Sequence, residues 1–135
     1  GSITGLYTVL VEGDDMNDPI GDTVRSIVDG HVVLSRALAQ KGHFPAVDVL
    51  QSNSRVMRNV VSNDHFRASL TVRELMAIYK ESEDLINIGA YKSGSSPRID
   101  AAIKMEGPIE AMLKQDVAES TTFVDAENQL LSLGC

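Results

Sequence analysis

The stretch AVDVLQSNSRVM, residues 46–57, decides how this chain is organised. It opens with the apolar run 46–50, which is typical of a buried strand, and continues through small polar residues to Arg55. Three roles are open to this arginine: it can pair with a carboxylate, be solvated, or present its planar head to an anion such as a phosphate. Open α/β sheets bind ligands at the carboxyl ends of parallel strands, which favours phosphate contact here.

Two further apolar runs lie upstream of this stretch. Residues 6–12 (LYTVLVE) and 31–34 (HVVL) are apolar runs without strict alternation, which predicts buried strands. Such strands are typical of a parallel sheet covered on both faces. Residues 1–62 are therefore predicted to belong to an α/β domain. Since three short strands cannot form such a sheet unaided, we expect further strands upstream of Gly1.

Polar residues between these strands predict two short helices. Asp22 is a candidate N-cap for a helix through Val28. Ser35 is a candidate N-cap for a helix over 36–41, which Gly42 ends. Strand, helix and strand thus alternate along this half, as a parallel sheet requires.

From Asn63 onward, apolar residues recur every three or four positions, which predicts amphipathic helices. The first is a long helix capped by Asn63 and stopped by Gly89. The second covers 97–104, breaks at Gly107-Pro108 and resumes over 109–114. The last is capped by Thr121 or Thr122 and ends at Leu133. Residues 63–135 are therefore predicted to form a small helical bundle.

The composition excludes several classes of protein. The net charge is −7, with 19 acidic and 12 basic residues, which argues against nucleic-acid binding because phosphate neutralisation needs a basic face. The longest apolar runs are about half a dozen residues, whereas a membrane-spanning helix needs about 20. Cys135 is the single cysteine, so an internal disulfide is excluded and a reducing compartment is favoured.

The sequence contains no phosphate-cradling GxxxxGK[ST], GxGxxG, CxxC or HExxH motif, so any chemistry must be supplied in part by other residues. The three histidines and Cys135 lack metal-ligand spacing, and we predict no metal site. The acidic residues Asp14, Asp15 and Asp18 follow the first predicted strand. They are typical of a solvated connection, and they lack the ligand pattern of a calcium loop.

Taken together, these residues resemble a known family. The chain is similar to the catalytic subunit of the flagellar and type III secretion export ATPases, which are relatives of the catalytic subunit of rotary ATP synthases. The segments that carry the resemblance are GSIT (1–4), VEGDDMNDPI (11–20), DGHVVLSR (29–36), PAVDVL (45–50), SRVM (54–57) and LINIGAY (85–91).

The resemblance implies that the chain is the C-terminal third of such a subunit, the edge of a RecA-like P-loop NTPase domain followed by a helical domain. In the family, the phosphate-binding loop, the metal-binding aspartate and the catalytic glutamate lie upstream. ATP and Mg²⁺ would be bound mainly by those residues. The chain alone is expected to bind no nucleotide and to be inactive.

The resemblance also gives Arg55 a role. In the pair Ser54-Arg55 it matches the family's arginine finger, which reaches into the nucleotide site of the neighbouring subunit of a homohexamer. A guanidinium there stabilises the negative charge that spreads over the transferring phosphoryl group. Hydrolysis of ATP would then depend on assembly.

Three further sites are implied by the resemblance. Phe44 matches an aromatic residue, usually tyrosine, that packs against adenine, and stacking needs only the ring face. The alternative for Phe44 is a core aromatic beside Pro45. Tyr91, in the IGAY turn, is a second candidate for the wall of this adenine pocket. The acidic loop with Asp14, Asp15 and Asp18 matches the loop that faces the central channel and the stalk in the rotary relatives.

The implied partners are further copies of the chain, a central stalk protein, export chaperones and the export gate. The implied location is the cytoplasm, peripheral to a membrane complex at the inner face of the cell membrane. Two alternatives stay open: a helical binding module for chaperones or stalk, and a subunit of a proton-translocating rotary ATPase. DGHVVLSR and the IGAY turn favour the export branch over the second.

Overall fold

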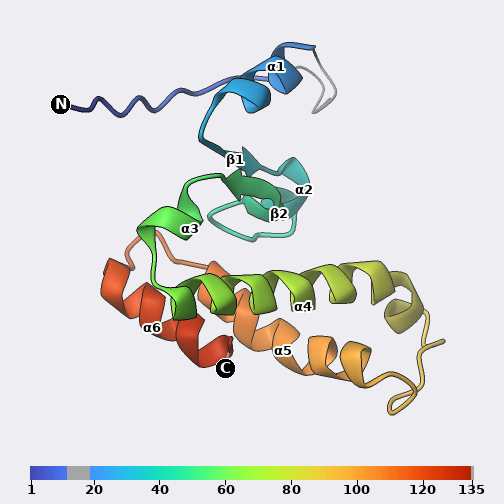
Figure 1. The fold of residues 1–135 in the computed structure, drawn as a ribbon. Helices are drawn as coiled ribbons and strands as arrows, with labels where there is room; N and C mark the ends of the chain where they lie inside the picture. The colour runs from blue at the N-terminus through green and yellow to red at the C-terminus, as the bar shows by residue number, and fades with distance from the viewer. Residues whose placement is uncertain (12–18, 135) are drawn as a thin grey trace.

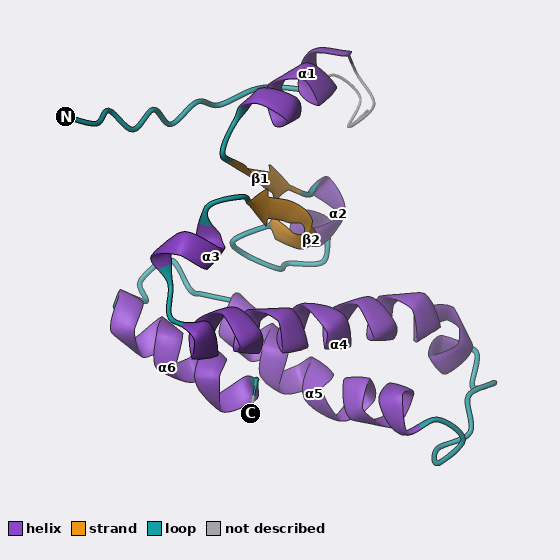
Figure 2. Cartoon of the chain, in the orientation of Figure 1, coloured by secondary structure: helices purple, strands orange, loops and turns teal. Residues whose placement is uncertain are grey.

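The computed structural model describes residues 1–11 and 19–134 and arranges them in three parts (Figure 1). An extended N-terminal segment and one helix lie at one end of the molecule, a small sheet lies in the middle, and a helical bundle lies at the other end (Figure 2). The elements are, in chain order, α1 (Pro19–Ile27), β1 (Gly30–Leu34), α2 (Arg36–Gln40), β2 (Val47–Ser54), α3 (Met57–Val60), α4 (Asn63–Asn87), α5 (Pro97–Leu113) and α6 (Phe123–Leu133).

The strand predicted at residues 6–12 is not formed over its described part, 6–11. Leu6 and Leu10 are 96% and 93% exposed, and the segment runs away from the sheet (Figure 1). A strand needs a neighbouring backbone that pairs with its N–H and C=O groups. Among the described residues the sheet consists of β1 and β2 only, so nothing there pairs with this segment.

The prediction of a parallel sheet is also wrong for these two strands. β1 and β2 pair antiparallel, with Gly30 opposite Ser54 and Leu34 opposite Val47. The connecting helix α2 has 5 residues and rises about 7.5 Å, whereas the 5 residues of β1 span about 17 Å. Because α2 is too short to carry the chain back along β1, β2 returns in the opposite direction.

The caps are confirmed at two helices and corrected at two others. The hydroxyls of Ser35 and Thr122 accept the N–H groups of the third residue of α2 and α6, and Thr122 is thus the cap among the two predicted candidates Thr121 and Thr122. In α4 the cap is Ser62 rather than Asn63, because Ser62 has the extended backbone of an N-cap and its Oγ accepts the His65 N–H at 3.1 Å. Asp22 is not a cap, since α1 already begins at Pro19.

The long bulge of β2 shapes the middle of the molecule. His31 and Val33 are two positions apart on β1, yet their partners on β2 are Asn53 and Asp48, five positions apart. The extra residues are held locally. Asp48 accepts the Gln51 N–H at 3.0 Å and Gln51 Nε2 at 2.9 Å through its two carboxylate oxygens. The Asp48 carboxylate is therefore one of the groups that hold the bulge.

The helical bundle of α4, α5 and α6 is confirmed (Figure 2). Its buried apolar residues are small or branched, with Ala68 and Val72 on α4 and Ala102 and Ile109 on α5. Small side chains let helices approach closely. The end of α6 comes so near that a Cβ on Gly134 would lie 2.4 Å from the Ala68 Cβ.

The break predicted at Gly107-Pro108 is wrong, because α5 runs without interruption from Pro97 to Leu113 and contains Pro108. Proline lacks the N–H that would bond to the Lys104 carbonyl, and its ring crowds that carbonyl. The helix continues because Ile109, the next residue, is buried at 4% exposure against its neighbours. Tertiary packing thus overrides the local preference.

We expect Pro108→Ala to raise the free energy of unfolding of this chain by about 1 to 3 kcal/mol, since it restores one helical hydrogen bond. The matched control is Gly107→Ala, an adjacent site where a new Cβ meets nothing within 4 Å. Its expected gain is about 0.5 to 1 kcal/mol. Urea unfolding measures both, and equal gains would show that Pro108 adds no cost of its own.

A second prediction concerns the bulge and pH. Burial alone would raise the pKa of the Asp48 carboxyl, but hydrogen bonds from Gln51 and the charge of Lys80 outweigh it, and the pKa is lowered. The folded state therefore gains stability from ionised Asp48 above the ordinary value of 3.8, and this gain is lost as the pH falls through the lower, folded value.

Urea unfolding at several pH values tests this. Asp48→Asn should be less stable than the parent at pH 6, and the gap should shrink as the pH falls below 3.8. Asp84→Asn, at an exposed position of α4, serves as the control. A gap that stays constant with pH would show that the charge of Asp48 is not what holds the bulge.

Candidate functional site

Arg55 lies at the point where β2 ends and the sheet meets α1. Its backbone N–H donates to Asp29 O at 2.8 Å, one step beyond the pair of Gly30 and Ser54. The backbone at Arg55 is thus tied to the start of β1 and cannot drift from the sheet.

The guanidinium of Arg55 contacts the C-terminal end of α1. Nη1 donates to Ser26 O and Nη2 donates to Arg25 O, each at 3.1 Å. Carbonyls in the last turn of a helix lack intrahelical partners and carry partial negative charge, so a cation is favoured there. These bonds differ from a carboxylate pair and from simple solvation, two of the roles open from sequence. They use two of the five N–H donors of an exposed arginine.

A second arginine, which the sequence analysis missed, lies on the opposite side of β2. Arg73 of α4 donates through Nη1 to Val49 O at 2.6 Å and to Ser52 O at 3.1 Å, and through Nη2 to Leu50 O at 3.3 Å. No pattern in the sequence marks this contact, because Arg73 reaches a segment more than twenty positions away.

Phe44 is not a core residue, because it is 55% exposed. It lines a hollow of about 400 Å³ together with the segment that follows α5, including Gln115 and Val117. The Gln115 N–H donates to Phe44 O at 2.8 Å and fixes this approach. A flat ring face beside polar groups suits a planar heterocycle. The sequence analysis missed Gln115 and Val117, because they lie outside any periodic pattern.

Charged groups surround this hollow. Lys114 Nζ lies 2.6 Å from Glu110 Oε1, and the hydrogen bond from Lys114 lowers the pKa of the Glu110 carboxyl. His43 Nδ1 approaches the same oxygen at 4.0 Å. The hollow is thus lined by Lys114, which is paired with Glu110, and by the carboxylates of Asp116 and Glu119.

Tyr91 lies far from Phe44. Its hydroxyl oxygen lies 3.0 Å from both Ser96 O and Asp100 Oδ1, at the N-terminal end of α5, and its single proton can be donated to either acceptor. Phe44 contacts the segment beyond the other end of α5, whose 17 residues span about 25 Å. Within one chain these two predicted residues are not brought together, and Tyr91 stabilises the loop before α5.

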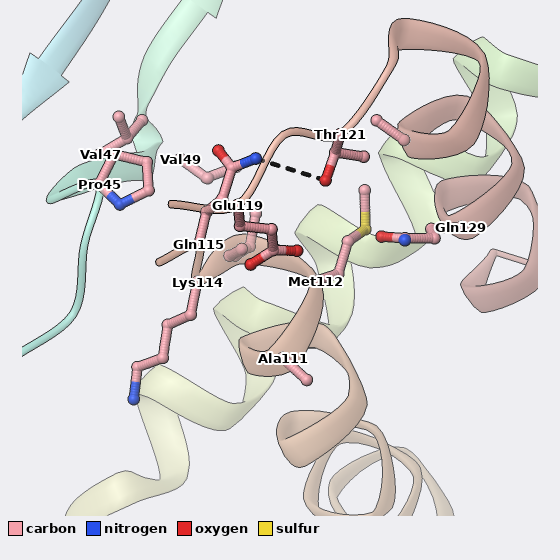
Figure 3. A pocket seen from close by; sticks show the side chains of 12 residues that line it. Pro45, Val47, Val49, Ala111, Met112, Lys114, Gln115, Glu119, Thr121 and Gln129 are labelled. Carbon is pink, nitrogen blue, oxygen red and sulfur yellow. Dashed lines mark hydrogen bonds between the residues drawn. The ribbon is translucent and has the colours of Figure 1, made fainter. Parts of the chain in front are cut away.

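Between the sheet and the bundle, packing is incomplete. A cavity of about 340 Å³ separates the start of β2 from the ends of α5 and α6 (Figure 3). Pro45 and Val47 line it from the sheet, and Met112 and Gln129 line it from the helices. Gln115 Nε2 donates across one edge to Thr121 Oγ1 at 3.3 Å. The two halves therefore do not share one continuous apolar core here.

The remaining predicted residues Asp14, Asp15 and Asp18 lie outside the described residues. Within residues 1–11 and 19–134, no three His, Cys, Asp or Glu side chains gather in a way that could hold a metal ion. None of the helices described is both long enough and apolar enough to cross a membrane.

Comparison with known proteins identifies the chain. Residues 61–132 match the model of the T3SS EscN ATPase C-terminal domain, and residues 1–54 match that of the ATP synthase alpha/beta family nucleotide-binding domain. The flagellum-specific ATP synthase of Bacillus subtilis is 56% identical over 98% of this chain and 30% of its own length. The chain thus spans about a third of the relatives it matches.

Two solved structures agree with these matches. The assembled ATPase EscN of the enteropathogenic E. coli type III secretion system superposes with a TM-score of 0.94 at 47% identity, over 100% of this chain and 33% of that one. EscN in complex with its central stalk EscO superposes with a TM-score of 0.80 at 44% identity, over 87% of this chain and 29% of that one. The chain therefore belongs to the family of flagellar and type III secretion export ATPases, whose C-terminal domain model it matches over residues 61–132.

Proposed function

We propose that this chain is the C-terminal part of a subunit that hydrolyses ATP to energise flagellar or type III protein export. The support is membership of the export ATPase family together with the site at the end of β2. In this proposal β1 and β2 form the edge of a RecA-like domain. The subunit works as a homohexamer, cytoplasmic and peripheral to a membrane complex.

Arg55 is the proposed arginine finger. The observation that carries this proposal is an exposed guanidinium at the end of β2, fixed to α1 by two of its donors with three others remaining. Those donors can meet the phosphate oxygens of ATP bound by the next subunit, where a planar fork fits better than an ammonium. Mg²⁺, when bound with ATP, neutralises charge on the same phosphates. We assign the metal ligands to the part of the subunit outside this chain.

The hollow at Phe44 is the proposed place of the adenine ring. Its fit rests on the exposed ring face and on the polar segment around Gln115. Tyr91 is left out of this proposal, since it belongs to the opposite end of α5. Apolar contact of the base with Phe44 orients the nucleotide of the chain's own subunit, whereas Arg55 acts on that of its neighbour.

EscN forms a complex with a central stalk protein, and we propose a stalk as a partner of this subunit as well. Asp14, Asp15 and Asp18 remain the predicted contact. Export chaperones and the export gate remain predicted partners of the helical domain.

Steady-state ATP hydrolysis by the full-length subunit tests the role of Arg55. We expect Arg55→Ala to lower kcat about 10³-fold and Arg55→Lys to recover only part of the loss, because lysine lacks the fork. Since Arg55 also holds α1, thermal unfolding of each variant is measured beside activity.

A mixing experiment separates the loss of the arginine finger from a loss of folding stability. Arg55→Ala subunits are combined with subunits whose phosphate-binding loop is disabled but whose Arg55 is intact. Recovery of activity is expected, because the second kind completes the site of the first. Normal turnover by Arg55→Ala alone would overturn the finger assignment.

For the hollow, we expect Phe44→Ala to raise KM for ATP about tenfold, corresponding to the loss of an aromatic contact of about 1 kcal/mol or slightly more. Phe44→Tyr retains the ring face and should leave KM within twofold of the parent. Both are measured in the full-length enzyme. An unchanged KM in Phe44→Ala would contradict the proposal that adenine binds in this hollow.

A further inference from the structure

Arg73 is the polar connection between the helical bundle and the strand that ends at Arg55. It is half-buried on α4, and its guanidinium donates to the carbonyls of Val49, Leu50 and Ser52 on β2. Three acceptors from one short segment, at 2.6 to 3.3 Å, leave this segment little freedom relative to α4.

These carbonyls lie in and beside the bulge. In a regular antiparallel ladder every second residue of β2 would bond to β1, whereas the bulge sets five positions of β2 against two of β1. Ser52 Oγ takes the place of a backbone group by accepting the Val33 N–H at 2.9 Å. Carbonyls without a partner in the ladder need donors, and Arg73 supplies donors to those of Val49, Leu50 and Ser52, whereas Asp48 O accepts from Ser52 Oγ and Gln51 O lies 3.0 Å from His31 Nε2.

The path from Arg73 to Arg55 is short and held at both ends. Ser52 O accepts from Arg73, and three residues later the Arg55 N–H donates to Asp29 O at 2.8 Å. The guanidinium of Arg55 then bonds to α1. Because a cavity lies beside β2 where it faces α5 and α6, apolar packing on that side fixes the strand less firmly than a filled core would.

We propose that Arg73 is a positioning residue for Arg55: it fixes the bulge of β2 to α4, so the helical domain sets where the arginine finger stands. Arg73 touches no nucleotide and acts through the strand. The inference rests on the proposed function of Arg55. The position of α4 then affects where Arg55 lies in the catalytic site of the neighbouring subunit.

The test uses the full-length ATPase carrying Arg73→Gln, which retains a polar group but loses the fork and the charge. We expect kcat to fall about 10- to 100-fold through misplacement of Arg55, with KM for ATP within twofold of the parent. The matched control is Arg98→Gln. Arg98 also bonds to α4, at 2.8 Å to Glu74 Oε1, but its side chain is 72% exposed and this bond stays within the bundle. Its activity should stay within twofold.

A merely structural defect is separated from positioning by mixing. If Arg73 acts through Arg55, its loss harms the neighbour's site, so subunits with a disabled phosphate-binding loop and an intact Arg73 should restore part of the activity of Arg73→Gln subunits. The double variant Arg55→Ala/Arg73→Gln gives a second test. Its single-turnover rate should be no more than about threefold below that of Arg55→Ala, because the effects of two residues that act as one unit do not add. The inference would be overturned if mixing restored no activity, or if adding Arg73→Gln to Arg55→Ala lowered the rate by the same factor as in the parent.

Folding and the parent proposal are controlled separately. If Arg73→Gln fails to assemble, Arg73→Lys replaces it; its single ammonium cannot span the three carbonyls as the fork does, and we expect an intermediate loss of kcat with the same rescue. Normal activity of Arg73→Lys and Arg73→Gln beside an inactive Arg55→Ala would sink this inference alone. Normal ATP hydrolysis by Arg55→Ala would contradict both the proposed role of Arg55 and this inference.

Discussion

The guanidinium of Arg73 against the bulge of β2 is the contact that ties β2 to the helical bundle by hydrogen bonds. One side chain of the helical bundle donates to three carbonyls in and beside the bulge. A hydrogen bond to a charged donor in a half-buried place is worth more than a neutral bond at the surface. The cavity nearby makes this contact more important, since apolar packing there is incomplete.

Arg55 and Arg73 both donate to backbone carbonyls, on the two sides of β2. Backbone carbonyls are left without partners at the end of α1 and at the bulge, and each set is met by an arginine from a distant part of the chain. Arg73 lies half-buried, whereas Arg55 is exposed at the end of the strand. The exposed arginine is the one available to a second subunit, and the half-buried one is suited to hold the strand.

In the proposed function this chain supplies only part of each nucleotide site. The hollow at Phe44 and the guanidinium of Arg55 belong to different regions of the sheet, and in the proposed hexamer each serves a different nucleotide. Such a division makes catalysis depend on contact between subunits. It also gives the helical domain, through α4 and β2, a physical route to the chemistry.

Local chemistry in the sequence determined the β1 segment, the core of β2, the three helices of the bundle, and the caps Ser35 and Thr122. It also singled out Arg55, and the resemblance to the family added Phe44, because strand composition, capping and motif residues act over a few positions. Tertiary structure alone decided the antiparallel pairing, the bulge, and the unbroken course of α5 through Pro108. It also paired Arg73 with β2 and separated Tyr91 from Phe44. These features depend on which distant backbone groups are left to be satisfied and which faces are buried, and no pattern of neighbouring residues encodes that.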